Sequence, residues 1–210
     1  MMTPQPRIPP ASQMTDPQLL FISDDLKLTS ATVSNVAWND QQASNLAFEK
    51  CVFDNVHLSG AVLDDLMVRD VRFHSCDLAN LKCRKAYFER VVFENCRMLG
   101  FDVQECRIKD VKFIDSKCDM SLFRFSVLRT AVFDSCSLKD SDFQNADLEG
   151  ARFARCNLER AQFSGVKLNR ADLRGSEIRG IRLSLKDVKG AIIDPTQAAE
   201  LAFLMGVTFS

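Results

Sequence analysis

The feature that most constrains this 210-residue chain is a repeat of five residues. From residue 26 to residue 195 the third place of every unit is apolar, and the register runs through 34 consecutive units without an insertion. A period of five matches neither the 3.6-residue turn of an α-helix nor the two-residue alternation of a continuous strand. It matches a short extended piece followed by a corner. The repeat therefore predicts a chain that turns after every five residues.

The charged residues indicate which places face inward. Lys, Arg, Asp and Glu make up 26% of the chain, so the 68 first and third places would hold about 18 of them by chance. They hold one, Lys186. Places one and three of an extended piece point to the same side, and burying an unpaired charge is strongly unfavourable. We therefore expect the first and third places to form the core and the others to face solvent.

Glycine marks the corner. Seven of the eight glycines occupy the fifth place of a unit. Glycine adopts the positive φ angles that tight turns require without steric penalty. The fifth place is therefore predicted to be where the chain turns.

Individual units identify a family. ADLEG at residues 146–150, ARFAR at 151–155 and ADLRG at 171–175 resemble the A-[D/N]-L-x-x motif of the pentapeptide-repeat proteins, and the match covers about four-fifths of the chain. The resemblance implies an all-β fold, a right-handed quadrilateral β-helix with four pentapeptides per coil. For 34 units this gives about 8.5 coils. We expect the solenoid to span residues 19–195, followed by a short α-helical cap.

Four units per coil would stack residues twenty apart, about 4.8 Å from coil to coil. Phenylalanine recurs at this spacing, which predicts a ladder of rings up one face, formed by Phe53, Phe73, Phe93, Phe113, Phe133 and Phe153. Core packing accounts for such a column, and no cofactor is expected.

All eight cysteines occupy first or third places, so we expect them to point inward. Free cysteine is a small apolar side chain that is often buried. Cys76/Cys96 and Cys136/Cys156 would be stacked pairs at a spacing that a disulfide allows, although a reducing cytoplasm favours free thiols. No histidine faces inward and no C-x-x-C sequence occurs, which argues against a metal site.

The pattern changes at both ends of the chain. Residues 1–18 contain five prolines, and we expect them to form a mobile arm. After the last unit, Asp194 can cap a helix with Pro195 in its first turn and Gly206 at its end. Residues 196–210 are therefore expected to form a helix and a short strand.

This helix is predicted to seal the last coil with one side and to form a homodimer with the other. The apolar residues assigned to that dimerisation helix are Ala198, Leu201, Ala202, Phe203, Leu204 and Met205. The alternative is that the helix only caps the end of the solenoid.

The layout of residues 194–206, DPTQAAELAFLMG, resembles the C-terminal dimerisation helix of the topoisomerase-interacting branch of the family, the Qnr-type and MfpA-type proteins. That resemblance implies a dimeric rod that binds DNA gyrase and protects it from quinolones or toxins. The leading hypothesis is therefore a non-catalytic binding protein of the inhibitor-resistance type, with a type II topoisomerase such as DNA gyrase as its partner. The alternative is a general protein–protein interaction scaffold or structural rod without gyrase activity.

Members of that branch are described as DNA mimics, and the expected surface charge here differs from that of DNA. Residues 26–195 contain 26 Lys and Arg and 24 Asp and Glu, a net charge of +2, whereas duplex DNA carries one negative charge per ~1.7 Å. Outward charges such as Asp65, Lys85 and Glu105 would alternate in one stacked column.

Several outward places hold apolar residues within one or two coils, where polar residues would be expected. Exposed apolar surface often marks a binding site, so these residues form a candidate partner patch: Ile114, Met120, Leu122, Phe125, Val127 and Val132.

Other function classes are not favoured. The histidines, His57 and His74, lie at outward places, and no Ser-His-Asp arrangement, phosphate loop or inward carboxylate pair is present, so no enzyme activity is expected. The net charge of −1 and the lack of a basic patch with exposed aromatic residues argue against direct nucleic-acid binding. No apolar run approaches the ~20 residues of a membrane span, and no secretory signal is recognisable. The expected location is the cytoplasm.

Overall fold

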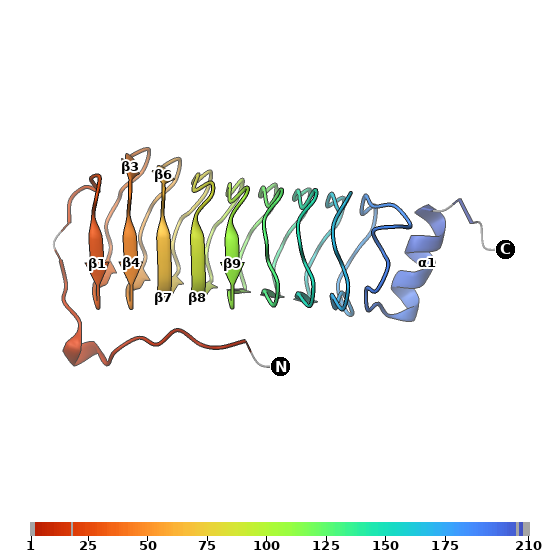
Figure 1. Cartoon of the computed structure of the whole chain (residues 1–210), viewed down its shortest axis with the longest axis horizontal. Helices are drawn as coiled ribbons and strands as arrows, with labels where there is room; N and C mark the ends of the chain where they lie inside the picture. Colours follow the sequence, from red (N-terminus) through yellow and green to blue (C-terminus); the bar gives the residue numbers. More distant parts are fainter. Residues whose placement is uncertain (1–2, 18, 205, 208–210) are drawn as a thin grey trace.

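The chain forms a rod of stacked coils (Figure 1), seen in a computed structural model that describes residues 3–17, 19–204 and 206–207. The described residues contain one 3-10 helix, twelve short strands and one α-helix. In chain order these are η1 (Ala11–Gln13), β1 (Lys27–Thr29), β2 (Thr32–Ser34), β3 (Gln42–Ser44), β4 (Ala47–Glu49), β5 (Val52–Asp54), β6 (Val62–Asp64), β7 (Met67–His74), β8 (Tyr87–Glu94), β9 (Arg107–Lys109), β10 (Lys112–Ile114), β11 (Val132–Asp134), β12 (Arg152–Ala154) and α1 (Pro195–Leu204).

Successive coils pair in parallel with a constant shift of twenty residues. Lys27 of the first coil lies beside Ala47 of the second, and at the other end of the rod Asp172 lies beside Ile192 of the next coil. Each coil therefore contains four pentapeptides, and the rod has about eight coils. In Figure 1 the front strands run downward as the rod advances to the right, which is the right-handed sense. The predicted right-handed quadrilateral solenoid is confirmed.

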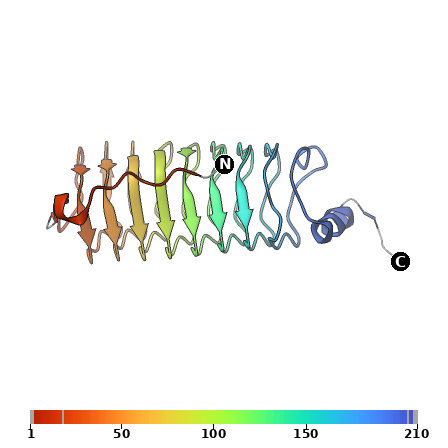
Figure 2. The same ribbon diagram turned by 90° about the horizontal axis from the view of Figure 1, so that it is seen from below.

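The four faces are named here A to D after the central residue of each in one coil: Val103, Ile108, Phe113 and Cys118. Most strands lie on faces B and C, and β7 and β8 continue around the corner between these two faces. One ten-stranded sheet covers them, while β3 and β6 pair separately on face A. Figure 2 shows the strands of face C side by side along the rod.

The corners share one backbone conformation. Every fifth residue from Asp25 to Gly180 has a φ between 48° and 75°. Of these 32 corners 26 are not glycine, and half of the 26 are Asn or Asp, the residue types that most readily adopt this left-handed region after glycine. The corner at the fifth place is confirmed, but glycine marks only a minority of the corners.

Phenylalanine rings organise the core. All central residues from Leu28 to Ile178 are buried. The predicted ladder on face C is present, with neighbouring ring centroids 4.5–5.1 Å apart and nearly parallel rings. A second column on face A, which the sequence analysis did not identify, contains Phe123, Phe143 and Phe163. Its rings meet the first ladder edge-on at 5.8–6.1 Å, so the two columns interlock across the interior.

The described part of the N-terminal arm, residues 3–17, runs back along the rod from its first coil (Figures 1 and 2). Thr15 pairs with the backbone on both sides of Ala31. Further along, the backbone N–H of Arg7 donates to Asp70, and the Thr3 hydroxyl donates to the carbonyl of Thr130. The arm thus follows the corner between faces B and C, and its predicted mobility stays a prediction.

Candidate interaction surfaces

The interior of the solenoid is filled by its own side chains. In the described coils an apolar gap of about 10 Å³ lies among Phe48, Phe88, Phe101 and their neighbours. A cavity of that size holds at most one water molecule. Any ligand or partner must therefore bind to the outer surface of the rod.

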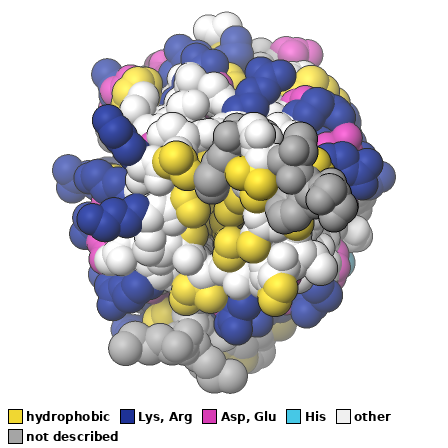
Figure 3. Space-filling view, turned by 90° about the vertical axis from the view of Figure 1, so that its right-hand side faces the viewer, with side chains coloured by type: hydrophobic (Ala, Val, Ile, Leu, Met, Phe, Trp, Pro, Cys, Tyr) yellow, Lys and Arg dark blue, Asp and Glu magenta, His cyan; other side chains and the backbone are white. Residues whose placement is uncertain are grey.

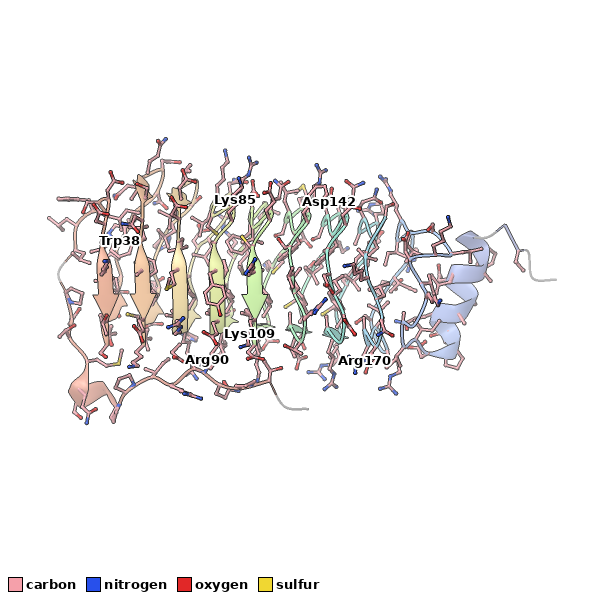
Figure 4. The ribbon with its side chains drawn as sticks, viewed as in Figure 1. Trp38, Lys85, Arg90, Lys109, Asp142 and Arg170 are labelled. Carbon is pink, nitrogen blue, oxygen red and sulfur yellow. The ribbon has the colours of Figure 1, made fainter. Side chains whose placement is uncertain are left out.

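One polar groove of about 310 Å³ opens on face A; it is lined by Arg124, Asp140, Asp142, Gln144, Arg160, Gln162 and Arg182. Most of its charges are already paired. Arg124 Nε lies 2.6 Å from Asp142 Oδ2, and Arg160 holds Asp140 through two hydrogen bonds of 2.9 and 2.8 Å. These two bonds lower the pKa of Asp140. Figure 4 shows Asp142 on the upper edge of the rod.

The Arg124–Asp142 pair belongs to a recurring brace between coils. In each brace an arginine reaches an aspartate eighteen residues later, and the three examples are Arg84–Asp102, Arg124–Asp142 and Arg129–Asp147. The same aspartates accept a hydrogen bond from the backbone N–H two residues further on. The aspartates are nearly buried while the arginine side chains are about half exposed, so each brace links two neighbouring coils at the surface of the rod.

A second ion-pair cluster lies where the arm crosses the corner between faces B and C. Arg90 donates two hydrogen bonds to the buried Asp70, at 2.7 and 2.8 Å, and one of 2.6 Å to Glu89. The hydrogen bonds from Arg90 lower the pKa of Asp70. Arg7 adds its backbone N–H to the same carboxylate at 3.0 Å. Arg90 lies on the lower edge of the rod in Figure 4, next to the arm.

The C-terminal helix closes the last coil as predicted, with Pro195 in its first turn and Asp194 as its cap. Asp194 Oδ1 accepts the backbone N–H of Gln197, and Gln197 Oε1 accepts that of Asp194, which is the reciprocal arrangement of a capping box. The buried Gln197 also donates through Nε2 to the carbonyls of Leu173 and Ser176. This role of Gln197 was not predicted from the sequence, although a glutamine three residues after a capping aspartate is a recognisable signal.

The residues predicted for the dimerisation helix are distributed as follows. Leu201 is buried in the core, Ala202 is partly buried, and Ala198 and Phe203 are exposed. The side chain of Leu204 and the whole of Met205 lie outside the described residues, as do residues 208–210 of the predicted strand. Leu201 seals the coil end, while the dimer stays a prediction.

The candidate partner patch is divided between faces. Ile114 and Val132 lie on face C and are half-buried in strands β10 and β11. Leu122 lies on face A between two exposed corners, Met120 and Phe125. Val127 follows on face B and is also exposed. The structure thus brings four of the six residues, Met120, Leu122, Phe125 and Val127, onto neighbouring surface, which we call the side patch.

Neither histidine lines the apolar gap or the polar groove described above. His74 Nδ1 lies 2.7 Å from Asp54 Oδ1, with both side chains about half exposed, and His57 faces outward between Ala37 and Asp77 of the adjacent coils. In the column of alternating charges, Lys85 and Glu105 form an ion pair of 3.9 Å.

All eight cysteines are buried and free. Burial raises the pKa of Cys106 to about 12 and that of Cys83 well above its ordinary value, which keeps these thiols protonated and unreactive. Within the part of the chain that the structure describes, no three His, Cys, Asp or Glu side chains cluster as a metal site requires. No described helix is long and apolar enough to span a bilayer.

Coils of four pentapeptides, with buried first and third places and left-handed corners, define a quadrilateral β-solenoid. Two family models match the chain, one described as "Pentapeptide repeat region" over residues 66–143 and one as "Pentapeptide repeats (8 copies)" over residues 136–175. Together they cover just over half of the sequence. The chain belongs to the pentapeptide-repeat proteins. No curated protein sequence matches it.

Similar solved structures come from the same family. Full-length QnrB1, a plasmid-mediated fluoroquinolone resistance protein, is 20% identical, and the match covers 84% of this chain and 100% of QnrB1 with a TM-score of 0.37. HetL, a pentapeptide-repeat protein involved in heterocyst differentiation regulation in Nostoc sp. strain PCC 7120, is 16% identical over 82% of this chain and 91% of HetL, with a TM-score of 0.39. A pentapeptide-repeat protein of the Arabidopsis thaliana thylakoid lumen is 24% identical over 44% of this chain and 71% of its own, with a TM-score of 0.35. Because these TM-scores are below 0.5, the family assignment rests on the family models and the twenty-residue register.

Proposed function

We propose that this protein is a non-catalytic rod that binds a protein partner, and that the partner is a type II topoisomerase such as DNA gyrase. The observation that carries the proposal is helix α1, which begins directly after the last coil in a layout that resembles the dimerisation helix of the gyrase-interacting branch. The filled interior supports a binding role, because it leaves only the outer surface for recognition.

The positions of the histidines and the burial of the thiols support the non-catalytic part of the proposal. Both histidines face outward, and burial raises the pKa of the Cys83 and Cys106 thiols, which keeps them protonated. A cytoplasmic location is proposed because eight free cysteines fit a reducing compartment.

The side patch is proposed as the contact surface on the rod. Phe125 is 58% exposed and Met120 is 53% exposed, and the two side chains lie on the two edges of face A. Large exposed aromatic side chains often supply much of the energy of an interface. Many charges on the middle of the rod are paired with one another, three of the pairs being the Arg–Asp braces, so we infer that apolar contact rather than mimicry of DNA charge dominates the binding.

A supercoiling assay tests the proposal. Purified protein is added to DNA gyrase with and without a quinolone, and we expect either inhibition of supercoiling or relief of the quinolone effect at micromolar concentration. Phe125→Asp should weaken the effect about tenfold or more, the loss typical of a central interface residue. Phe21→Asp, a change at a similarly exposed phenylalanine at the N-terminal end of the rod, well away from the side patch, is the matched control.

No effect of the wild-type protein on gyrase would overturn the topoisomerase assignment and leave a general interaction scaffold. An undiminished effect of Phe125→Asp would exclude the side patch while keeping the partner. Both variants are first compared with the wild type by circular dichroism, so that a loss of folding is not mistaken for a loss of binding.

A further inference from the structure

The charges of this protein are distributed unevenly along the rod. Residues 1–65 contain three Lys and Arg against eight Asp and Glu, residues 66–150 contain fourteen of each sign, and residues 151–210 contain ten against six. The N-terminal end of the rod is therefore acidic, the middle is neutral and the C-terminal end is basic. The net charge of −1 for the whole chain conceals this division.

At the N-terminal end, four exposed carboxylates belong to no ion pair among the described residues: Asp16, Asp24, Asp25 and Asp40. One exposed lysine, Lys27, lies in the same coil. Next to these charges two large apolar side chains face solvent, Leu20 at 86% exposure and Phe21 at 67%. Among the described strands β1 pairs only with β4, and Leu19 and Ile22 of the preceding segment pack on the core at this end.

At the C-terminal end the signs are reversed. Arg182, Lys186 and Lys189 are exposed and form no ion pair with any residue that the structure describes. Leu185 is 65% exposed, and Ile192 is also exposed. Figure 3 looks onto this end and shows apolar side chains near the centre with Lys and Arg around them. This end therefore has an apolar middle and a basic rim.

We propose that copies of this protein associate head to tail, with the acidic N-terminal end of one rod docked on the basic C-terminal end of the next. Each end offers exposed apolar side chains, and their charges are opposite in sign. Of the ten large apolar side chains that are exposed in the described residues, six lie at the two ends of the rod. The symmetric homodimer predicted from the sequence would use the same C-terminal end and would place two basic rims against each other, so the head-to-tail contact is an alternative to that homodimer.

The geometry of a head-to-tail contact determines the kind of assembly that forms. A head-to-tail contact is heterologous, so it does not close after two copies unless the rotation forms a ring, and it otherwise extends into a filament. The contact also depends on salt, because the screening length falls from about 30 Å at 0.01 M to about 3 Å at 1 M ionic strength. This association goes beyond the partner binding proposed above and stands whether or not a topoisomerase binds.

Sedimentation over a range of protein concentrations tests the proposal. At about 0.01 M salt we expect the mean mass to rise with concentration beyond twice the monomer mass of 23.7 kDa, and at about 1 M salt to fall back toward the monomer. A mass that stays at the monomer at low salt, or that stops at a dimer, would overturn the head-to-tail contact. The second outcome would favour the symmetric dimer.

Charge reversal at one end at a time identifies the contact. The first variant carries Asp16→Lys and Asp40→Lys, and the second carries Arg182→Glu, Lys186→Glu and Lys189→Glu. Each variant alone should remain monomeric under conditions in which the wild type associates. An equal mixture should associate again, because each rod then finds an end of opposite charge on the other variant.

The first variant separates the two possible assemblies. A symmetric contact through the C-terminal ends would leave the self-association of Asp16→Lys/Asp40→Lys unchanged, and that result would refute the proposal. Circular dichroism and thermal unfolding of both variants establish that they fold. If they do fold and the mixture nevertheless fails to associate, the contact does not join these two ends.

Discussion

As far as Gly180, the fifth residue of each unit occupies a backbone conformation that most side chains avoid. In the left-handed region the Cβ atom crowds the following carbonyl, at a cost of roughly 1–2 kcal/mol for residues other than glycine. Asn and Asp bear this conformation better than other residues and fill half of the non-glycine corners. Thr130, with a φ of 63°, is β-branched and is one of the least suited residues at a corner.

Thr130→Asn is therefore expected to stabilise the protein by about 0.5–1 kcal/mol, because asparagine relieves the crowding while the backbone carbonyl that accepts from Thr3 is kept. Chemical denaturation monitored by circular dichroism measures the difference. The reciprocal change Asn145→Thr, at a corner with a φ of 56°, should destabilise by a similar amount. If both variants were as stable as the wild-type protein, the corner conformation would not be strained.

The phenylalanine ladders concentrate packing energy in single side chains. Phe133 stacks on Phe113 and Phe153 and meets Phe123 and Phe143 edge-on. Phe133→Ala should therefore cost about 3–5 kcal/mol of unfolding free energy, as truncation of a buried aromatic residue does. Phe125→Ala, at an exposed corner, should change it by no more than about 0.5 kcal/mol. A similar loss in both variants would contradict the assignment of the core.

At the scale of an element, helix α1 depends on the ionised Asp194. Its hydrogen bonds, first from Thr196 and then from the backbone of Gly175 and Gln197, lower the pKa of Asp194 from 3.8 to about 2. Because the pKa is lower in the folded state, the contribution of Asp194 is fully present above pH 3.8 and is lost as the pH falls toward 2.

We therefore predict that the amide signals of Gly175 and Gln197 in NMR spectra shift together between pH 4 and about pH 2, since both amides donate to the Asp194 carboxylate. Asp194→Asn should remove this shared transition and loosen the start of α1. Independent transitions of the two amides, or none, would mean that Asp194 does not link the helix to the last coil.

The elements could be predicted from the sequence to different degrees. The strands and the core follow from the five-residue period, because one rule decides the burial of every first and third place from Leu46 to Ile181. At the two ends the rule weakens, and Lys186 at a first place is exposed. The cap was also predictable, since Asp194, Pro195 and Gly206 are local signals. The path of the arm was not, because its contacts with Asp70 and Thr130 join positions more than sixty residues apart and no periodic signal links them.

The candidate partner patch shows the same limit on the surface. Apolar residues at outward places could be found by counting, but their grouping depends on the face to which each place belongs. Val132 and Leu122 are ten residues apart and thus two faces apart, whereas Phe125 and Val127 meet around one corner. Assigning each residue to one of the four faces from its place in the twenty-residue coil would have separated the residues of the patch.

At the scale of the whole molecule, each coil contacts mainly the coils next to it, so the rod behaves as a stack of nearly equivalent layers. Duplication of residues 151–170, which contain Phe153 and Phe163, should therefore yield a folded, longer rod with the same circular dichroism per residue and a similar midpoint of thermal unfolding. This site lies beyond the last arm contact at Thr130, so the arm is not disturbed. A midpoint of thermal unfolding well below that of the wild-type protein would contradict the description of the rod as a stack of nearly equivalent layers.

The constant twenty-residue register also makes residue number a measure of angle. Each unit advances the chain by a quarter of a revolution, so the direction in which α1 and the basic end point relative to the arm is set by the number of units between them. Adding twenty residues keeps that direction, whereas adding five rotates everything that follows by a right angle without changing any single coil. Insertions in multiples of five residues therefore rotate one end of this protein relative to the other in steps of a quarter of a revolution.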